Sequence, residues 1–154
     1  MGRKYMVAFD GACEPVNPGG IASWGYTVVE NGKELMFANG VAGEGTGMTN
    51  NIAEYTALVT VLRALRKVVT KGDSVKIQGD SQLVIRHLKG EYKVRAAGLK
   101  PLYLDAVGLI GELTGSGTRV EFAWVPREEN ERADTLSHEA YEQYRSRKAQ
   151  RTRK

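Results

Sequence analysis

The apolar positions of the chain begin in short runs that are typical of β-strands. A β-prone run, Tyr5–Phe9, ends at Asp10-Gly11. A second run, Ile21–Glu30, is followed by Asn31-Gly32, which is a strong hairpin turn signal. A third run extends from residue 33 to about Val41. Three consecutive strands joined by short turns predict an antiparallel meander at the start of the fold.

After this meander the apolar residues follow a helical period. They recur at three- and four-residue intervals, at Ile52, Tyr55, Leu58, Val59, Leu62, Leu65 and Val69. This spacing predicts an amphipathic helix. The remaining pattern predicts, in order, a strand over Ser74–Gln78, a helix from Gly79-Asp80-Ser81 to Lys89-Gly90, a helix over Pro101–Leu113, a strand over Thr118–Val125 and a helix from Asn130. The order β-β-β-α-β-α-α-β-α predicts an α/β fold, with helices packed on a mixed sheet.

Composition favours one globular domain, and the charge is unevenly distributed. The chain has 154 residues and a net charge of +4. Six of its 22 basic residues follow position 144, where no acidic residue occurs, so residues 1–144 carry 16 basic against 18 acidic residues. Such a basic tail attracts polyanions, of which nucleic acid is the first to consider. The alternative is a solvated, disordered terminus.

Several classes of protein are excluded by the sequence. The longest uncharged stretch, Pro15–Val29, is interrupted by proline and glycines and cannot form a membrane span. The apolar run after Lys4 is too short for a signal-peptide core. The single cysteine, Cys13, excludes an internal disulfide and a cysteine-based zinc site. We therefore expect a soluble cytoplasmic protein that does not associate with membranes.

Four acidic residues stand at the predicted ends of elements, and each has an ordinary structural explanation. Asp10 fits a turn with Gly11, and Asp80 fits a helix N-cap. Glu54 fits a capping box with Asn51. Asp134 belongs to an acidic run that suits a solvated first turn of a helix.

Taken together, the four acids suggest a metal centre. Strands that end near Asp10 and residue 78 can place carboxylates at one edge of a mixed sheet. Carboxylates brought close repel one another unless a cation lies between them. Hard oxygen ligands suit Mg²⁺ or Mn²⁺, and a pair of such ions can promote phosphodiester hydrolysis. A nucleophilic triad has little support, because His87 and His138 lack a triad-like context.

Four sequence blocks, in this order, resemble those of the type 1 ribonuclease H family. They are Asp10-Gly11-Ala12-Cys13 with Asn17-Pro18-Gly19-Gly20, Thr49-Asn50-Asn51-x-x-Glu54, Gly79-Asp80-Ser81-Gln82-Leu83-Val84, and Asn130-Glu131-Arg132-Ala133-Asp134. The resemblance implies the ribonuclease H-like fold, a five-stranded mixed sheet with helices on both faces. It also implies an endonuclease that cuts the RNA strand of RNA–DNA hybrids with two Mg²⁺ ions, for which Mn²⁺ can substitute, leaving 5′-phosphate and 3′-hydroxyl ends.

The resemblance also implies roles for individual residues. Asp10, Glu54, Asp80 and Asp134 match the metal-binding carboxylates. The positions expected to contact the hybrid are Gly11, Cys13, Asn17, Thr49, Asn50, Asn51, Gln82 and Arg127. Short polar side chains suit this task because RNA is distinguished from DNA at its 2′-hydroxyl. Residues 1–144 would form the catalytic domain and 145–154 a basic tail, in a monomer without an obligate protein partner.

Two departures point to an archaeal-like subgroup of the family. The loop before Asp134 lacks the histidine of many members and carries Arg127, which stays protonated and cannot act as a base. The segment Gly90–Lys100 is too short for the family's basic protrusion, so the basic tail is expected to supply the missing contacts to the hybrid. The alternative is that the tail packs Tyr141 and Tyr144 onto the sheet. His138 is expected to be packed or in a supporting role, and Trp24 and Trp124 are expected in the core. The alternative functions are a broader ribonuclease that also cuts duplex RNA and a non-catalytic hybrid-binding module.

Overall fold

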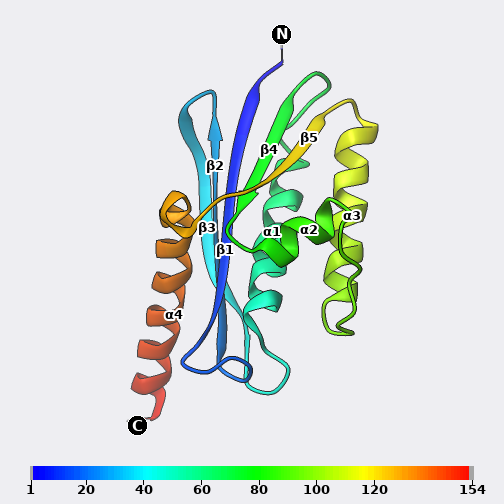
Figure 1. Cartoon of the computed structure of the whole chain (residues 1–154). Helices are drawn as coiled ribbons and strands as arrows, with labels where there is room; N and C mark the ends of the chain where they lie inside the picture. Colours follow the sequence, from blue (N-terminus) through cyan, green and yellow to red (C-terminus); the bar gives the residue numbers. More distant parts are fainter. Residues whose placement is uncertain (1, 153–154) are drawn as a thin grey trace.

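A five-stranded mixed sheet forms the centre of the protein, as seen in a computed structural model that describes residues 2–152 (Figure 1). The strands are β1 (Lys4–Glu14), β2 (Ile21–Glu30), β3 (Lys33–Glu44), β4 (Ser74–Gly79) and β5 (Arg119–Trp124). They lie in the order β3-β2-β1-β4-β5. The first three pair antiparallel, whereas β4 runs parallel to β1 and to β5. The meander and the mixed sheet are therefore confirmed.

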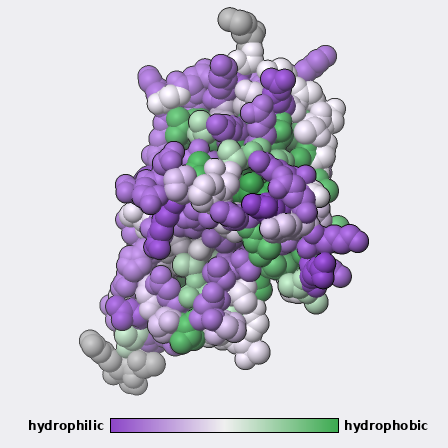
Figure 2. All heavy atoms as spheres, in the orientation of Figure 1, coloured by the Kyte–Doolittle hydropathy of each residue, from purple (hydrophilic) through white to green (hydrophobic). Residues whose placement is uncertain are grey.

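Helices cover both faces of this sheet. They are α1 (Asn50–Leu65), α2 (Gln82–Leu88), α3 (Lys100–Gly115) and α4 (Glu131–Thr152), with a 3-10 turn over Arg127–Glu129. In Figure 1, α4 lies on one side of the sheet and the other three lie on the opposite side. No helix within residues 2–152 is long and apolar enough to cross a membrane. Figure 2 shows hydrophilic side chains over most of one face of the molecule.

The main core lies between the sheet and α1. Val7 and Phe9 of β1, Ile77 of β4, and Leu58 and Leu62 of α1 are fully buried in one apolar cluster. Burying each such side chain contributes about 1.5–3 kcal/mol. Alternate residues of β1 point into this cluster, as the two-residue period of a strand requires. The core therefore holds β1 and α1, which both carry predicted site residues, in one rigid body.

The first strand is longer than its apolar run indicates, and the turn interpretation of Asp10 is wrong. β1 continues to Glu14 and pairs Asp10 with Gly25 of β2. A Cβ atom on Gly11 would lie 2.4 Å from the backbone nitrogen of Glu54. Gly11 is thus required for the close approach of α1 to β1, not for a turn.

Two helix-cap interpretations are also corrected. The N-cap of α1 is Thr49, whose Oγ1 accepts a hydrogen bond from the Ile52 nitrogen at 3.1 Å, so Glu54 is free of a capping box. The N-cap of α2 is Ser81, not Asp80, and its hydroxyl accepts from the Val84 nitrogen. In both places a hydroxyl residue caps the helix, and Glu54 and Asp80 remain available for other contacts.

The expectations for two surface regions also need revision. Trp24 packs against the core, but Trp124 is 45% exposed because it ends the edge strand β5. Helix α4 passes position 145 without interruption and continues to Thr152, so the first part of the basic tail is helical. Arg153 and Lys154 lie outside the described residues.

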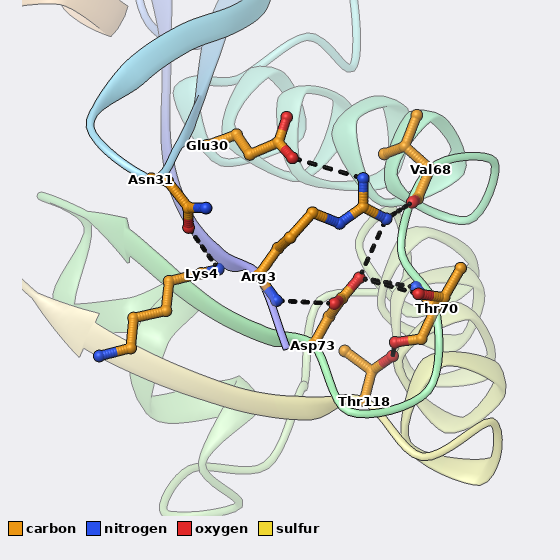
Figure 3. Close-up of polar contacts among 8 residues, drawn as sticks. All are labelled: Arg3, Lys4, Glu30, Asn31, Val68, Thr70, Asp73 and Thr118. Carbon is orange, nitrogen blue, oxygen red and sulfur yellow. Dashed lines mark hydrogen bonds and ion pairs between the residues drawn. The ribbon is translucent and has the colours of Figure 1, made fainter. Parts of the chain in front are cut away.

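The end of the sheet where β1 begins is fixed by a polar network around Asp73 (Figure 3). Its carboxylate accepts hydrogen bonds from the backbone nitrogens of Arg3 at 2.9 Å and Thr70 at 2.8 Å. The Arg3 guanidinium also bonds to the Val68 carbonyl and pairs with Glu30. Burial alone would raise the pKa of Asp73, but these hydrogen bonds outweigh it and lower the pKa. The network ties β1 to the loop that leads into β4.

Candidate active site

Three carboxylates from three separate elements meet beside β1. One carboxylate oxygen from each of Asp10, Glu54 and Asp80 lies within 4.8 Å of the other two. Asp10 comes from β1, Glu54 from α1 and Asp80 from the residue after β4. Asp10 and Glu54 are each only 5% exposed. Three of the four acids predicted as metal ligands are therefore brought together.

The meeting point exists because β4 is shorter than β1. The pairing of β1 with β4 stops at Phe9 and Gly79, whereas β1 continues to pair with β2 as far as Glu14. From Asp10 onward, β1 therefore has a free edge beside the end of β4. Glu54 reaches this edge from α1, which lies close to β1 at Gly11.

The electrostatics of the cluster strongly favour binding of a cation. Burial, and then the charge of Asp80, raises the pKa of Asp10 to about 8, although the Gly11 N–H that donates to it at 2.9 Å opposes this rise. Burial also raises the pKa of Glu54 and, less strongly, that of Asp80. Within the described residues, Oε2 of Glu54 is buried and has no hydrogen-bond partner. An orphaned carboxylate oxygen among acids with raised pKa values fits a divalent metal ion, because a metal would supply the missing partner and charge.

Asp134 lies next to this trio but is not among the carboxylates that approach one another within 4.8 Å. Its charge contributes to the raised pKa values of Asp10 and Asp80, so it faces the cluster. A Cβ atom on Gly25 would lie 2.8 Å from the carbonyl oxygen of Ala133, which shows how closely the start of α4 packs on β2. Since Gly25 pairs with Asp10, this packing sets the Asp134 carboxylate beside Asp10.

Arg127 accompanies Asp134. Its Nη2 lies 3.7 Å from Oδ2 of Asp134, in a pair whose side chains are 78% and 36% exposed respectively. The guanidinium therefore reaches the rim of the acidic cluster, where Asp80 also feels its charge. A pair this exposed is worth little as a stabilising contact and can readily rearrange.

Most of the remaining predicted contact residues lie on the loop after β1 and at the starts of α1 and α2, and we call these segments the rim of the site. Nδ2 of Asn17 donates a 2.8 Å hydrogen bond to Oδ1 of Asn50. The backbone nitrogen of Asn50 donates in return to Oδ1 of Asn17 at 3.2 Å. Thr49, Asn50 and Asn51 stand at the start of α1, about one turn before Glu54. Gly11 directly follows Asp10, and Gln82 begins α2 two positions after Asp80.

Cys13 has a different setting from the exposed rim residues. Its side chain is buried, and Sγ donates weakly to the carbonyl oxygens of Val16 at 3.2 Å and Met48 at 3.6 Å. These contacts join the loop after β1 to the residue before Thr49. The thiol therefore holds together the two segments that present Asn17 and Asn50.

Two residues at the site were not assigned roles from the sequence. Asn130 is buried, and its Nδ2 donates to the Phe9 carbonyl at 2.9 Å. Nε1 of Trp124 donates to the Asp80 carbonyl at 3.0 Å. Asn130 belongs to the last of the four sequence blocks, which was a usable signal, but nothing in the sequence pattern marked Trp124.

Comparisons with known proteins identify the family of the chain. A family profile described as "Reverse transcriptase-like" matches residues 8–140. The chain is 37% identical over 140 residues to the ribonuclease HI of Halobacterium salinarum, a match that covers 90% of this chain and 65% of that protein. The chain belongs to the type 1 ribonuclease H family.

Structures of the ribonuclease H family show the same fold. A ribonuclease H1 solved in complex with an RNA/DNA hybrid matches with a TM-score of 0.79 and 30% identity, over 91% of this chain and 98% of that one. A bifunctional protein of Mycobacterium tuberculosis is 31% identical over 137 residues, which is 89% of this chain but 35% of that protein. The chain thus spans about a third of the length of this relative.

Proposed function

We propose that the chain is an endonuclease that hydrolyses the RNA strand of RNA–DNA hybrids and leaves 5′-phosphate and 3′-hydroxyl ends. The observation that carries this proposal is the acidic trio, with Asp10 and Glu54 buried and one Glu54 oxygen unpartnered within the described residues. Family membership and the hybrid-bound relative support the choice of substrate. The hybrid is the partner, and the protein acts as a cytoplasmic monomer.

In this proposal, Asp10, Glu54, Asp80 and Asp134 hold two divalent ions, Mg²⁺ or Mn²⁺. Such a pair activates a water molecule and stabilises the leaving oxygen of a phosphodiester. Asp10 and Glu54 are held by the core, so they define the fixed side of the site. Asp134 is more exposed and pairs with Arg127, so it would complete the metal site from its exposed side.

The rim residues bind and orient the hybrid. Asn17, Asn50, Asn51 and Gln82 offer amide donors and acceptors to base edges and 2′-hydroxyls, as recognition of RNA through its shallow minor groove requires. Thr49 binds a phosphate of the DNA strand, and Gly11 and Cys13 contribute backbone contacts. Arg127 remains protonated, so it assists by charge at the phosphate and does not accept the proton of the attacking water.

The test is cleavage of one labelled sequence prepared as an RNA–DNA hybrid, duplex RNA and duplex DNA, with Mg²⁺, Mn²⁺ or EDTA. Metal-dependent cutting of the hybrid's RNA strand alone is the expected result. Equal cutting of duplex RNA would identify a broader ribonuclease instead. Tight hybrid binding without cutting under any metal would identify a binding module.

Variants make this test specific to the carboxylates. Asp80→Asn should abolish cleavage. Asp105→Asn is the matched control, because Asp105 is a half-exposed carboxylate on α3 that pairs only with Arg63 among the described residues. Equal activity in the two variants would contradict the proposed role of Asp80.

A further inference from the structure

The last turns of α4 are strongly basic. Arg145, Arg147, Lys148 and Arg151 lie within two turns of this helix, whereas residues 1–144 carry a small net negative charge. In Figure 1 this end of α4 lies at the same end of the molecule as the β1–β2 and β3–α1 connections. The positive charge of the protein is therefore concentrated at one end.

The basic end of α4 is fixed to the sheet. The Tyr144 hydroxyl donates to Oε1 of Glu44 at 2.9 Å, and Lys148 pairs with the same carboxylate. Tyr141, one turn earlier, is buried. The cations are thus held on a docked helix at the end of β3, where their positions relative to the acidic cluster are defined.

Two of these cations have no neutralising partner. Arg145 pairs with Glu142 and Lys148 with Glu44. Arg147 and Arg151 are one turn apart, and neither forms an ion pair with a carboxylate within residues 2–152. Both line a cleft of about 420 Å³ between α4 and β3, with Asn39, Gly40, Gln143 and Tyr144. This region, the α4–β3 cleft, combines uncompensated guanidinium groups with neutral hydrogen-bonding groups, which suits phosphate oxygens.

The α4 side of the α4–β3 cleft is linked to the rim of the site through Glu44, which binds Tyr144 and Lys148. Glu44 is followed by Gly45, whose nitrogen donates to the Gly20 carbonyl, and the Gly19 nitrogen donates to the Met48 carbonyl. These bonds join the end of β3 to the loop that carries Asn17 and to the start of α1. Along α4, Arg147 and Arg151 follow Asp134 by about 20 and 26 Å at 1.5 Å per residue. At about 3.4 Å per nucleotide, this distance corresponds to roughly six to eight base pairs.

We propose that the α4–β3 cleft binds the sugar–phosphate backbone of the hybrid about six to eight base pairs to one side of the cut, through Arg147 and Arg151. This inference rests on the proposed function, since it places the bound hybrid at the acidic cluster. Guanidinium groups contact phosphates without reading sequence, so the cleft adds affinity for the hybrid and fixes on which side of the cut it is held, but gives no base preference.

The test compares two double variants that remove equal charge. Arg147→Gln/Arg151→Gln removes two of the three cations that line the cleft and leaves Lys148, which is paired with Glu44. Lys76→Gln/Arg119→Gln removes two exposed cations from β4 and β5. Hybrid binding is measured in EDTA, by anisotropy of a labelled hybrid over a range of salt concentrations. We expect the cleft variant to bind roughly tenfold more weakly at moderate salt, with a salt slope smaller by about 1.8, because two phosphate contacts are lost. The control variant should bind like the wild type.

The position of the contact is tested with asymmetric hybrids. Hybrids that extend about 4 base pairs beyond the cut on one side are compared with hybrids that extend about 12 base pairs on that side, and the comparison is repeated for the other side. Longer extension should strengthen wild-type binding on one side more than on the other, and the cleft variant should lose that difference. Equal weakening of both double variants, or a loss independent of the side, would overturn the proposal.

Cleavage in Mg²⁺ separates this inference from the proposed function. If the wild type binds hybrid through the cleft but never cuts it, the proposed activity fails and the cleft contact stands. If the wild type cuts hybrid and the cleft variant binds and cuts equally well, the cleft proposal fails alone. Thermal melting of both variants confirms that neither is unfolded.

Discussion

Asn130 and Phe9, which are 121 positions apart in the chain, are joined by a buried hydrogen bond from the Asn130 amide to the Phe9 carbonyl. Phe9 is the last residue of β1 that pairs with β4, and Asp10 follows it directly. The bond therefore ties the start of α4 to the strand position from which the acidic cluster is built. It sets the spacing between Asp10 and Asp134 without touching either carboxylate.

Asn130→Ala should loosen this spacing and leave the Phe9 carbonyl unpaired. Loss of a buried hydrogen bond costs about 1–3 kcal/mol, which corresponds to a fall in melting temperature of about 2–4 °C per kcal/mol in a domain of this size. We expect kcat to fall about 10–100-fold and the Mg²⁺ concentration for half-maximal activity to rise, while KM changes little. Steady-state kinetics over a Mg²⁺ series measure this. A change in melting temperature with an unaltered Mg²⁺ requirement would mean that Asn130 is purely structural.

Asp10→Asn should abolish activity and stabilise the metal-free protein. Asn is neutral at every pH, whereas the folded metal-free protein must either keep Asp10 protonated or bury its charge beside Asp80. We expect a loss of cleavage of more than about a hundredfold, and a gain in stability of about 0.5–2 kcal/mol in EDTA. Cleavage assays and thermal melts of the same preparation test both parts. A variant that is inactive and also less stable than wild type would argue against repulsion in the trio.

The stability of the metal-free protein should fall as pH rises. Asp10 has a pKa of about 8 in the folded protein, compared with 3.8 for the free side chain, so the folded state holds the proton more tightly than the unfolded state. Its contribution to stability is fully present below pH 4 and is lost as the pH rises towards about 8. Melting temperatures in EDTA at several pH values between 5 and 8 would show the decline. The decline in melting temperature with pH should be smaller for the wild type in Mg²⁺ and for Asp10→Asn in EDTA. An equal decline in these two cases and in the wild type in EDTA would contradict this origin.

Gly11→Ala should damage both fold and site, although it adds one methyl group. The new Cβ would lie 2.4 Å from the Glu54 nitrogen, which is backbone and cannot move alone, so α1 must shift away from β1. Overpacking of this kind costs about 1–3 kcal/mol. We expect lower stability together with a large loss of activity. Gly108→Ala is the control, because a Cβ atom there meets nothing within 4 Å.

Asp73→Ala should destabilise the protein and leave its chemistry intact. The Asp73 carboxylate accepts from two backbone nitrogens at the opposite end of β1 from the rim, and its removal leaves these donors unsatisfied. The expected cost is about 1–3 kcal/mol at neutral pH. Because hydrogen bonds lower the pKa of Asp73, its contribution is present above the unfolded pKa and is lost as the pH falls through the folded pKa. Urea denaturation at neutral and acidic pH, with kcat/KM measured below the unfolding transition, tests both statements.

The sequence was sufficient for the element order because hydrophobic period and turn residues are local signals. It was insufficient for Asp10, where Asp-Gly resembles a turn until the pairing with Gly25 and the contact of Gly11 with α1 are known. The sequence also leaves the caps of α1 and α2 open, because several neighbouring polar residues can each cap the helix, and the structure assigns them to Thr49 and Ser81. The exposure of Trp124 depends on β5 being an edge strand, and the pairing of Arg127 with Asp134 depends on the path of a loop. Both depend on tertiary structure, which a local sequence pattern does not predict.

The early end of β4 has a consequence for self-association. From Asp10 to Glu14, β1 pairs with β2 but has no partner strand on its other edge within residues 2–152, and such an edge can accept a strand from another molecule. Here any added strand would have to cover the carboxylates of Asp10, Glu54 and Asp80 and strip them of water. The acidic cluster therefore also disfavours the addition of a strand to this edge of β1, and with it aggregation.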